Sequence, residues 1–224
     1  MRQRYPSGIF AKKSTARLLQ VLELVEKCRA AQSLSQEQDG LKKEKVLNLP
    51  KEKHVHIFDF DETLCKTNAS ITIKDKETGA DIIMHPTNYP GWRDEGWIEN
   101  YPGRFEMDFS EFQGYPVYGE PIDRTVLLLK VLLTSDEDHC VLVTGRDELS
   151  GPRAWLMNHG IDVDKMILMC SGDPNKRMCY ESVINTLRPT KIFLYEDTIL
   201  YIDQCKEVCE KYEIAFYPNL IEET

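Results

Sequence analysis

Two carboxylates stand at the end of an apolar stretch. The run Val55–Phe58 leads into Asp59 and Asp61, within the sequence Asp-Phe-Asp-Glu-Thr-Leu. Two acids at a strand end add no stability, because crowded carboxylates repel one another and resist burial. Phosphoryl transfer to a carboxylate does need two, since one Asp attacks phosphorus while a second shuttles the proton. The alternative interpretation is an acidic surface turn.

Further along the chain, two more apolar runs end in polar side chains. Thr144 and Arg146 stand at the end of the run that starts at Cys140. The hydroxyl of Thr144 can donate a hydrogen bond to a phosphoryl oxygen, and the guanidinium of Arg146 can bind phosphate bidentately. Asp197 follows the run 191–195, and together with Asp59 it could hold Mg²⁺, which prefers oxygen ligands. The alternatives are an ordinary turn after a core strand and an N-cap of the next helix.

A positive charge for the same site could come from Lys176. This residue stands at the start of an expected helix, where it would neutralise the nucleophile and the transferring phosphoryl group. Arg177 and Lys191 are rivals for the role. The alternative for Lys176 is a solvated lysine on the surface.

The elements that must position these residues alternate between strand and helix. Strands are expected at about 54–60, 138–144, 165–170, 190–196 and 213–217, and helices at about 121–134, 148–159, 176–187 and 198–211. Continuous apolar runs are typical of buried parallel strands, and the alternation predicts an α/β fold with a doubly wound, Rossmann-like parallel sheet. In such a sheet, ligands bind at the carboxyl ends of the strands, where the polar residues above would meet.

In this order the stretches resemble the motifs of the haloacid dehalogenase-like (HAD) hydrolase superfamily over roughly residues 54–218. The matching residues are Asp59-Phe60-Asp61-Glu62-Thr63, Thr144, Lys176 and Glu196-Asp197. The resemblance implies a parallel sheet of HAD type and a Mg²⁺-dependent phosphatase.

Specific roles follow from that resemblance. Asp59 would be the nucleophile and Asp61 the acid and base, while Thr144 and Lys176 would bind phosphoryl oxygens. Mg²⁺ would be held by Asp59, Asp197 and the main-chain carbonyl of Asp61. Glu196 is a second candidate, either as a metal ligand or as a residue that supports the metal ligands. Arg146 is a candidate phosphate ligand.

The segment at about 65–120 departs from the strand–helix alternation. Residues 70–75 and 81–84 read as strands around a turn, which predicts a β-hairpin flap. A small irregular cap insert rich in aromatic residues, Pro and Gly follows, in which Trp92 and Arg104 could stack on bases and grip phosphates. The alternative is that these side chains only pack the insert. The layout resembles the HAD branch called Swiss Army Knife RNA-repair-like and the phosphatase domains of polynucleotide kinases.

Composition indicates a globular domain, expected at residues 51–224, preceded by an N-terminal helical extension and linker at residues 1–50. The chain has 224 residues, of which 42% are hydrophobic, and a net charge of −9, so its surface as a whole should not attract nucleic acid without specificity. No apolar run approaches the length of a membrane span. Seven scattered cysteines indicate a reducing compartment, hence a cytoplasmic location. The basic residues near the start leave a mitochondrial transit peptide as the alternative.

Two further sets of residues could carry chemistry but have ordinary interpretations. Cys205 and Cys209 lie one helical turn apart, and structural packing is favoured over half a metal site. His54 and His56 flank the first strand and are expected to be packing or surface residues.

The sequence thus predicts a Mg²⁺-dependent phosphomonoester hydrolase that acts through an aspartyl-phosphate. Its phosphorylated substrate would be a nucleotide, a nucleic-acid end or a small metabolite. The alternative is a non-catalytic HAD-fold binding module that uses the aromatic insert to contact nucleic acid or protein. The set Asp59, Asp61, Thr144 and Asp197 is intact, which favours the enzyme. The sequence makes no prediction of the oligomeric state.

Overall fold

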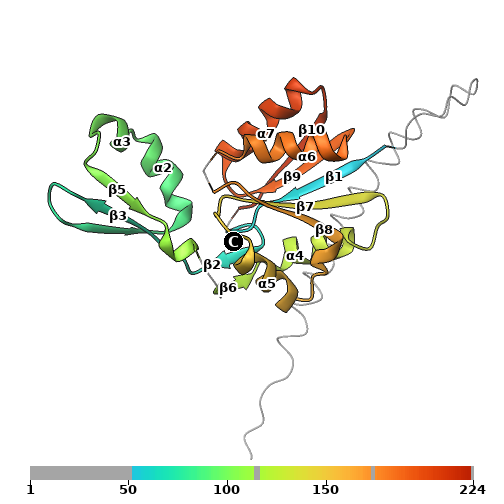
Figure 1. Ribbon diagram of the computed structural model, residues 1–224, viewed down its shortest axis with the longest axis horizontal. Coiled ribbons are helices and arrows are strands. Elements are labelled where there is room, and N and C mark those ends of the chain that lie inside the picture. Colours follow the sequence, from blue (N-terminus) through green and yellow to red (C-terminus); the bar gives the residue numbers. More distant parts are fainter. Residues whose placement is uncertain (1–51, 114–116, 173–174, 223–224) are drawn as a thin grey trace, which may run out of the picture. The chain divides into compact units, whose positions relative to one another are not determined.

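The computed structural model describes residues 52–113, 117–172 and 175–222. Within these ranges a five-stranded parallel sheet has the order β10-β9-β1-β7-β8 (Figure 1). The α/β fold with a doubly wound parallel sheet, predicted from the alternation, is confirmed. The predicted N-terminal extension at residues 1–50 lies outside the described residues and stays a prediction.

The strands of this sheet coincide with the apolar runs of the sequence. They are β1 (His54–Phe58), β7 (Asp138–Thr144), β8 (Met166–Cys170), β9 (Lys191–Glu196) and β10 (Ala215–Leu220). The main difference is at β10, which starts and ends later than expected because it pairs with β9 from Ala215, opposite Lys191, to Leu220, opposite Glu196. Pro218 is tolerated there because β10 is an edge strand.

The helices fill the connections between strands, as expected. They are α4 (Asp123–Leu132), α5 (Ser150–Asn158), α6 (Arg177–Leu187) and α7 (Ile199–Lys211). In the described part of the chain, no helix combines the length and the apolar character that crossing a bilayer would require.

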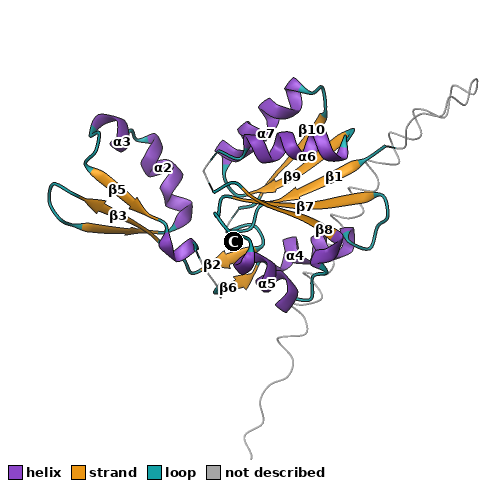
Figure 2. Ribbon diagram, viewed as in Figure 1, coloured by secondary structure: helices purple, strands orange, loops and turns teal. Residues whose placement is uncertain are grey.

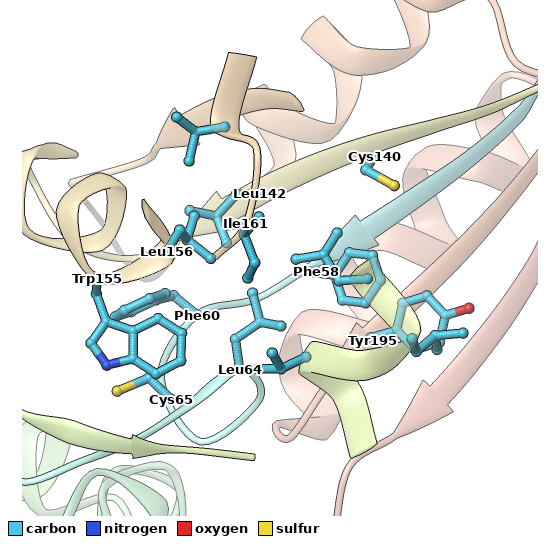
Figure 3. Packing of buried hydrophobic residues seen from close by; sticks show 14 residues of the cluster. Phe58, Phe60, Leu64, Cys65, Cys140, Leu142, Trp155, Leu156, Ile161 and Tyr195 are labelled. Atoms are coloured by element: carbon cyan, nitrogen blue, oxygen red, sulfur yellow. The ribbon is translucent and has the colours of Figure 1, made fainter. Parts of the chain in front are cut away.

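Alternate residues of the strands supply two separate cores. Ile57 and Leu194 belong to the core covered by α6 and α7. Phe58 and Tyr195 belong to the core covered by α4 and α5, where their rings stack with centroids 4.4 Å apart (Figure 3). Because successive side chains of a strand point to opposite faces, a strand buried on both faces must be apolar throughout. This requirement explains why the apolar runs in the sequence are continuous.

The insert contains the predicted hairpin and a third strand. Strands β3 (Ile71–Asp75) and β4 (Asp81–Met84) pair antiparallel, which confirms the hairpin, and β5 (Phe105–Asp108) pairs with the other side of β3 (Figure 2). Sequence reasoning missed β5 because its four residues pair with a strand far away in the chain. Short helices lie around these strands: η1 (Pro86–Asn88), α2 (Tyr89–Asp94), α3 (Trp97–Asn100) and η2 (Ser110–Phe112). A further short helix, η3 (Val163–Lys165), precedes β8.

A two-stranded ladder joins the insert to the rest of the chain. Strand β2 (Cys65–Thr67) pairs antiparallel with β6 (Gly119–Pro121). The two backbones approach so closely at Gly119 that a Cβ placed there would lie 2.5 Å from the carbonyl oxygen of Lys66 and would also overlap the sulfur of Cys65. The ladder therefore requires glycine at this position.

We expect Gly119→Ala to lower the free energy of unfolding by about 1–3 kcal/mol, since backbone atoms must move to admit the methyl group. Gly145→Ala is the matched control, because a Cβ at Gly145 meets no heavy atom within 4 Å. Urea unfolding followed by circular dichroism measures both. Equal free energies of unfolding for the two variants would show that the β2–β6 ladder can admit a methyl group without loss of stability.

Candidate active site

Strand β1 carries Asp59 to the carboxyl edge of the sheet. The main-chain N–H of Asp59 still donates to the carbonyl of Tyr195 in β9, at 3.0 Å, so the sheet itself holds this residue. The chain then turns sharply, with the N–H groups of Leu64 and Cys65 both donating to the carbonyl of Phe60 at 2.9 Å. Glu62 adopts a φ of 55° within this turn. The tight turn keeps Asp61 near the edge that Asp59 reaches.

Lys176 lies beside Asp59. Its Nζ donates to Oδ1 of Asp59 at 2.6 Å and to Oε2 of Glu196 at 2.9 Å, and only 1% of the lysine is exposed. Its main-chain N–H donates to Oε1 of Gln204 at 2.8 Å, and its Nζ lies 4.1 Å from the ring centre of Tyr201. Helix α7, which carries both contacts, therefore holds the lysine in place.

The rival cations lie elsewhere. Arg177 forms an exposed ion pair with Glu207 at 2.6 Å, and Lys191 pairs with Glu52 at 2.7 Å at the other end of β9. Of these three basic residues, the structure places only Lys176 against Asp59.

Three carboxylates meet at this point. The ligand atoms of Asp59, Glu196 and Asp197 lie within 4.8 Å of one another, which is close enough to hold one metal ion. Glu196 was only a second candidate in the sequence, yet it is buried and both of its oxygens are used. Oε2 accepts from Lys176, and Oε1 accepts from the main-chain N–H groups of Asp197 and Thr198.

Burial dominates the electrostatics of the cluster. It raises the pKa of Asp59 to about 8, with Glu196 adding to the rise and Lys176 opposing it. Burial likewise raises the pKa of Glu196 to about 8 and that of Asp197 to about 6. In the absence of a metal ion the three acids therefore resist full ionisation, because one lysine cannot offset three negative charges in a site of low dielectric.

The cation shows the opposite balance. Burial alone would lower the pKa of Lys176, but the charges of Asp59 and Glu196 outweigh burial, so this pKa lies well above its usual value. Lys176 is therefore a fixed positive charge at neutral pH.

A second charged pair lies at the end of β7. Arg146 binds Asp61 bidentately, with Nε 2.9 Å from Oδ2 and Nη2 2.7 Å from Oδ1. The hydroxyl oxygen of Thr144, which is fully buried, accepts from the main-chain N–H of Arg146 at 3.3 Å. The side chain predicted to bind substrate phosphate thus binds the predicted acid–base residue. A phosphate contact by Arg146 stays a prediction that would require it to leave Asp61.

The two candidate ligands of the insert are engaged within the insert. Arg104 binds Asp75 bidentately at 2.9 and 2.6 Å, which holds the pKa of Asp75 well below its usual range. The ring of Trp92 meets the ring of Phe105 edge-on at 5.4 Å. Binding of substrate by Trp92 and Arg104 stays a prediction.

His56, Cys205 and Cys209 pack within the fold. His56 stacks on Phe193 at 4.7 Å and shares a hydrogen bond with Asp138 at 3.2 Å. Cys205 and Cys209 are fully buried in the core between the sheet and helices α6 and α7, as the packing alternative expects.

Sequence reasoning missed Gln204, which fixes the main chain of Lys176. One signal was present, since Gln204 is a polar residue on the face of α7 that also carries Cys205 and Val208. An amide on a buried helix face usually has a hydrogen-bond partner.

Comparison with known proteins finds no family model and no curated protein that matches the sequence. Two solved structures of the Legionella pneumophila effector Ceg4 are similar in fold. The form that carries an N-terminal yeast Hog1p sequence is 15% identical, with a TM-score of 0.47 over 80% of this chain and 93% of that one. The form with an N-terminal TEV protease cleavage sequence is 14% identical, with a TM-score of 0.45 over 82% and 93%.

These findings correct the family prediction. The assignment to the HAD superfamily and to its RNA-repair-like branch is corrected, because no family model matches the sequence. The physical reason is that four short stretches carried the assignment, and polar residues at neighbouring strand ends meet in any parallel sheet. The chemistry of the site therefore has to be inferred from the positions of its side chains.

Removing the buried cation tests the balance of charges. We expect Lys176→Met to lower the free energy of unfolding by about 3–5 kcal/mol in metal-free buffer, because it leaves buried carboxylates unpaired. Adding Glu196→Gln should restore part of the loss, since it removes one of those charges. Urea unfolding of both single variants and the double variant gives the coupling energy.

The neighbouring Arg177→Met is the control for this cycle. It breaks an exposed pair and should cost about 0–1 kcal/mol. A loss for Lys176→Met no larger than that of the control would mean that the cluster is not a buried charge network.

Proposed function

We propose that this domain is a Mg²⁺-dependent phosphomonoester hydrolase that acts through an aspartyl-phosphate on Asp59. The observation that carries the proposal is the buried contact between Asp59 and Lys176 within a group of three carboxylates. An acid at a strand end, paired with a fixed cation and set beside further acids, suits attack on an anionic phosphoryl group.

Mg²⁺ fits the donor atoms that are present. Asp59, Glu196 and Asp197 offer carboxylate oxygens, the ligands that this ion prefers. The cluster contains three acids and one basic residue, Lys176, so binding of a divalent cation would offset the remaining negative charge. Such an ion, when bound, would polarise the phosphoryl oxygens and offset the charge of nucleophile and substrate. The main-chain carbonyl of Asp61 remains a proposed further ligand.

In the first step, formation of the aspartyl-phosphate, each side chain has a separate role. Lys176 donates to Oδ1 of Asp59, which leaves Oδ2 as the oxygen that attacks phosphorus. As the new O–P bond forms, the bond between phosphorus and the leaving oxygen breaks, and Asp61 donates a proton to that oxygen. Lys176 and the hydroxyl of Thr144 stabilise the charge on the phosphoryl oxygens.

The second step returns the enzyme to its starting state. Asp61 takes a proton from a water molecule, whose oxygen attacks the phosphorus bound to Asp59. The bond between phosphorus and Asp59 breaks, inorganic phosphate leaves, and Asp61 again carries the proton that the next turnover requires.

Asp59→Asn should abolish phosphate release while circular dichroism remains unchanged, because an amide cannot attack phosphorus. The assay uses Mg²⁺ with nucleotides, sugar phosphates, phosphopeptides, and oligonucleotides phosphorylated at the 3′ or 5′ end. Wild-type protein quenched during turnover should carry the mass of one phosphoryl group on the peptide that contains Asp59.

Asp203→Asn on the exposed face of α7 is the matched control and should retain full activity. Substantial turnover by Asp59→Asn would refute the mechanism. No release from any substrate by folded wild-type protein with Mg²⁺ would favour the alternative, a non-catalytic binding module.

Asp197→Asn tests the metal site separately. Loss of one carboxylate ligand should raise the Mg²⁺ concentration required for half-maximal activity by about tenfold or more. Titration of activity with Mg²⁺ measures the change, with Asp164→Asn as the exposed control. An unchanged Mg²⁺ requirement would remove Asp197 from the site.

A further inference from the structure

The side chain of Arg146 makes three hydrogen bonds at the carboxyl edge of the sheet. Nε and Nη2 both donate to Asp61, and Nη1 donates to the main-chain carbonyl of Phe112 at 2.7 Å. The guanidinium carbon lies 5.3 Å from the ring centre of Phe60 and 5.4 Å from that of Phe112. Only 5% of the residue is exposed.

These contacts leave Arg146 little freedom. Guanidinium offers five N–H groups in a planar fork, and here three nitrogens are committed in that plane while the aromatic rings lie against the group. To bind a substrate phosphate, the guanidinium would have to leave Asp61 and strand a carboxylate that is itself mostly buried.

The fork also sets the orientation of Asp61. Two parallel hydrogen bonds fix the plane of a carboxylate, whereas one hydrogen bond would allow it to rotate. A residue that must protonate a leaving oxygen needs such a fixed orientation, because small misplacements of a reacting group cost large factors in rate.

The third hydrogen bond reaches the insert. Phe112 belongs to η2, and the neighbouring Glu111 accepts from the main-chain N–H of Ser70, immediately before β3, at 2.8 Å. The segment that Arg146 holds is therefore tied in turn to the hairpin. Arg146 thus connects Asp61 with the main chain of the insert.

We propose that Arg146 is a positioning residue, which holds the Asp61 carboxylate in line with the leaving oxygen and ties it to the η2 segment of the insert. The proposal rests on the proposed function. It replaces the expectation that Arg146 binds substrate phosphate, and it assigns the hydrogen bond to Phe112 a part in ordering the acid.

The test uses the leaving group of the substrate. An alkyl phosphate needs a proton on its leaving oxygen, whereas p-nitrophenyl phosphate leaves as a stable anion without one. Because kcat/KM covers only the steps through departure of the leaving group, it isolates the first proton transfer from the later hydrolysis. A residue that positions the acid should matter for the first substrate and much less for the second.

Arg146→Lys keeps the charge but loses the fork. We expect it to lower kcat/KM for an alkyl phosphate by about 10²-fold and for p-nitrophenyl phosphate by less than about tenfold. Asp61→Asn should show the same dependence on the leaving group. In Arg146→Ala, added guanidinium ion should restore part of the activity on the alkyl phosphate. Arg153→Lys, which alters an exposed pair with Asp164, is the matched control and should leave both rates unchanged.

Equal losses on both substrates, with a rise in KM for each, would overturn the proposal and make Arg146 a phosphate ligand. The proposal would also be overturned if Asp61→Asn lost more kcat/KM on the alkyl phosphate than on p-nitrophenyl phosphate while Arg146→Lys lost the same factor on both. If Arg146→Ala does not fold, the comparison of the two substrates with Arg146→Lys still decides. Failure of the proposed function itself would be recognised separately, since wild-type protein would then release no phosphate or Asp59→Asn would remain active.

Discussion

Burial of charge at the carboxyl edge of the sheet is the constraint on which this structure depends. Asp59 and Glu196 are both buried. An ionised carboxylate that is buried without a partner lowers the stability of the fold by several kcal/mol. Lys176 lies between them, with its Nζ within hydrogen-bond distance of both. A buried lysine would itself be costly alone, so the three side chains are stable only together.

Much of the neighbouring structure holds this arrangement. The lysine stands at the start of α6, and Gln204 of α7 accepts from its main-chain N–H, so two helices fix the position of this residue. The sheet holds Asp59 through the hydrogen bond to Tyr195, and the positive φ of Glu62 allows the tight turn that follows. Each of these contacts confines a charged group to one position, which is the preorganisation that electrostatic catalysis requires.

The site contains two charged pairs with different surroundings. The pair of Asp59 and Lys176 lies with the acidic cluster next to β9, whereas the pair of Asp61 and Arg146 joins the end of β7 to the insert. Asp59 and Asp61, separated in the sequence only by Phe60, thus have separate cations. In the proposed mechanism this separation would let Asp59 face an anionic substrate as the nucleophile while Asp61 is held for proton transfer.

The fold and the composition of the edge could be predicted from the amino-acid sequence by itself. A strand buried on both faces must be apolar throughout, and a strand end must be polar where it meets solvent or ligand, so both appear as local patterns. The sequence therefore determined the parallel sheet, the hairpin and the acids at the ends of β1 and β9. Only the tertiary structure decided which charges pair, because Asp59 and Lys176 are 117 positions apart and Asp61 and Arg146 are 85 apart. Local patterns contain no information about such distances, and for this reason the sequence indicated neither the contact of Lys176 with Glu196 nor that of Arg146 with Asp61.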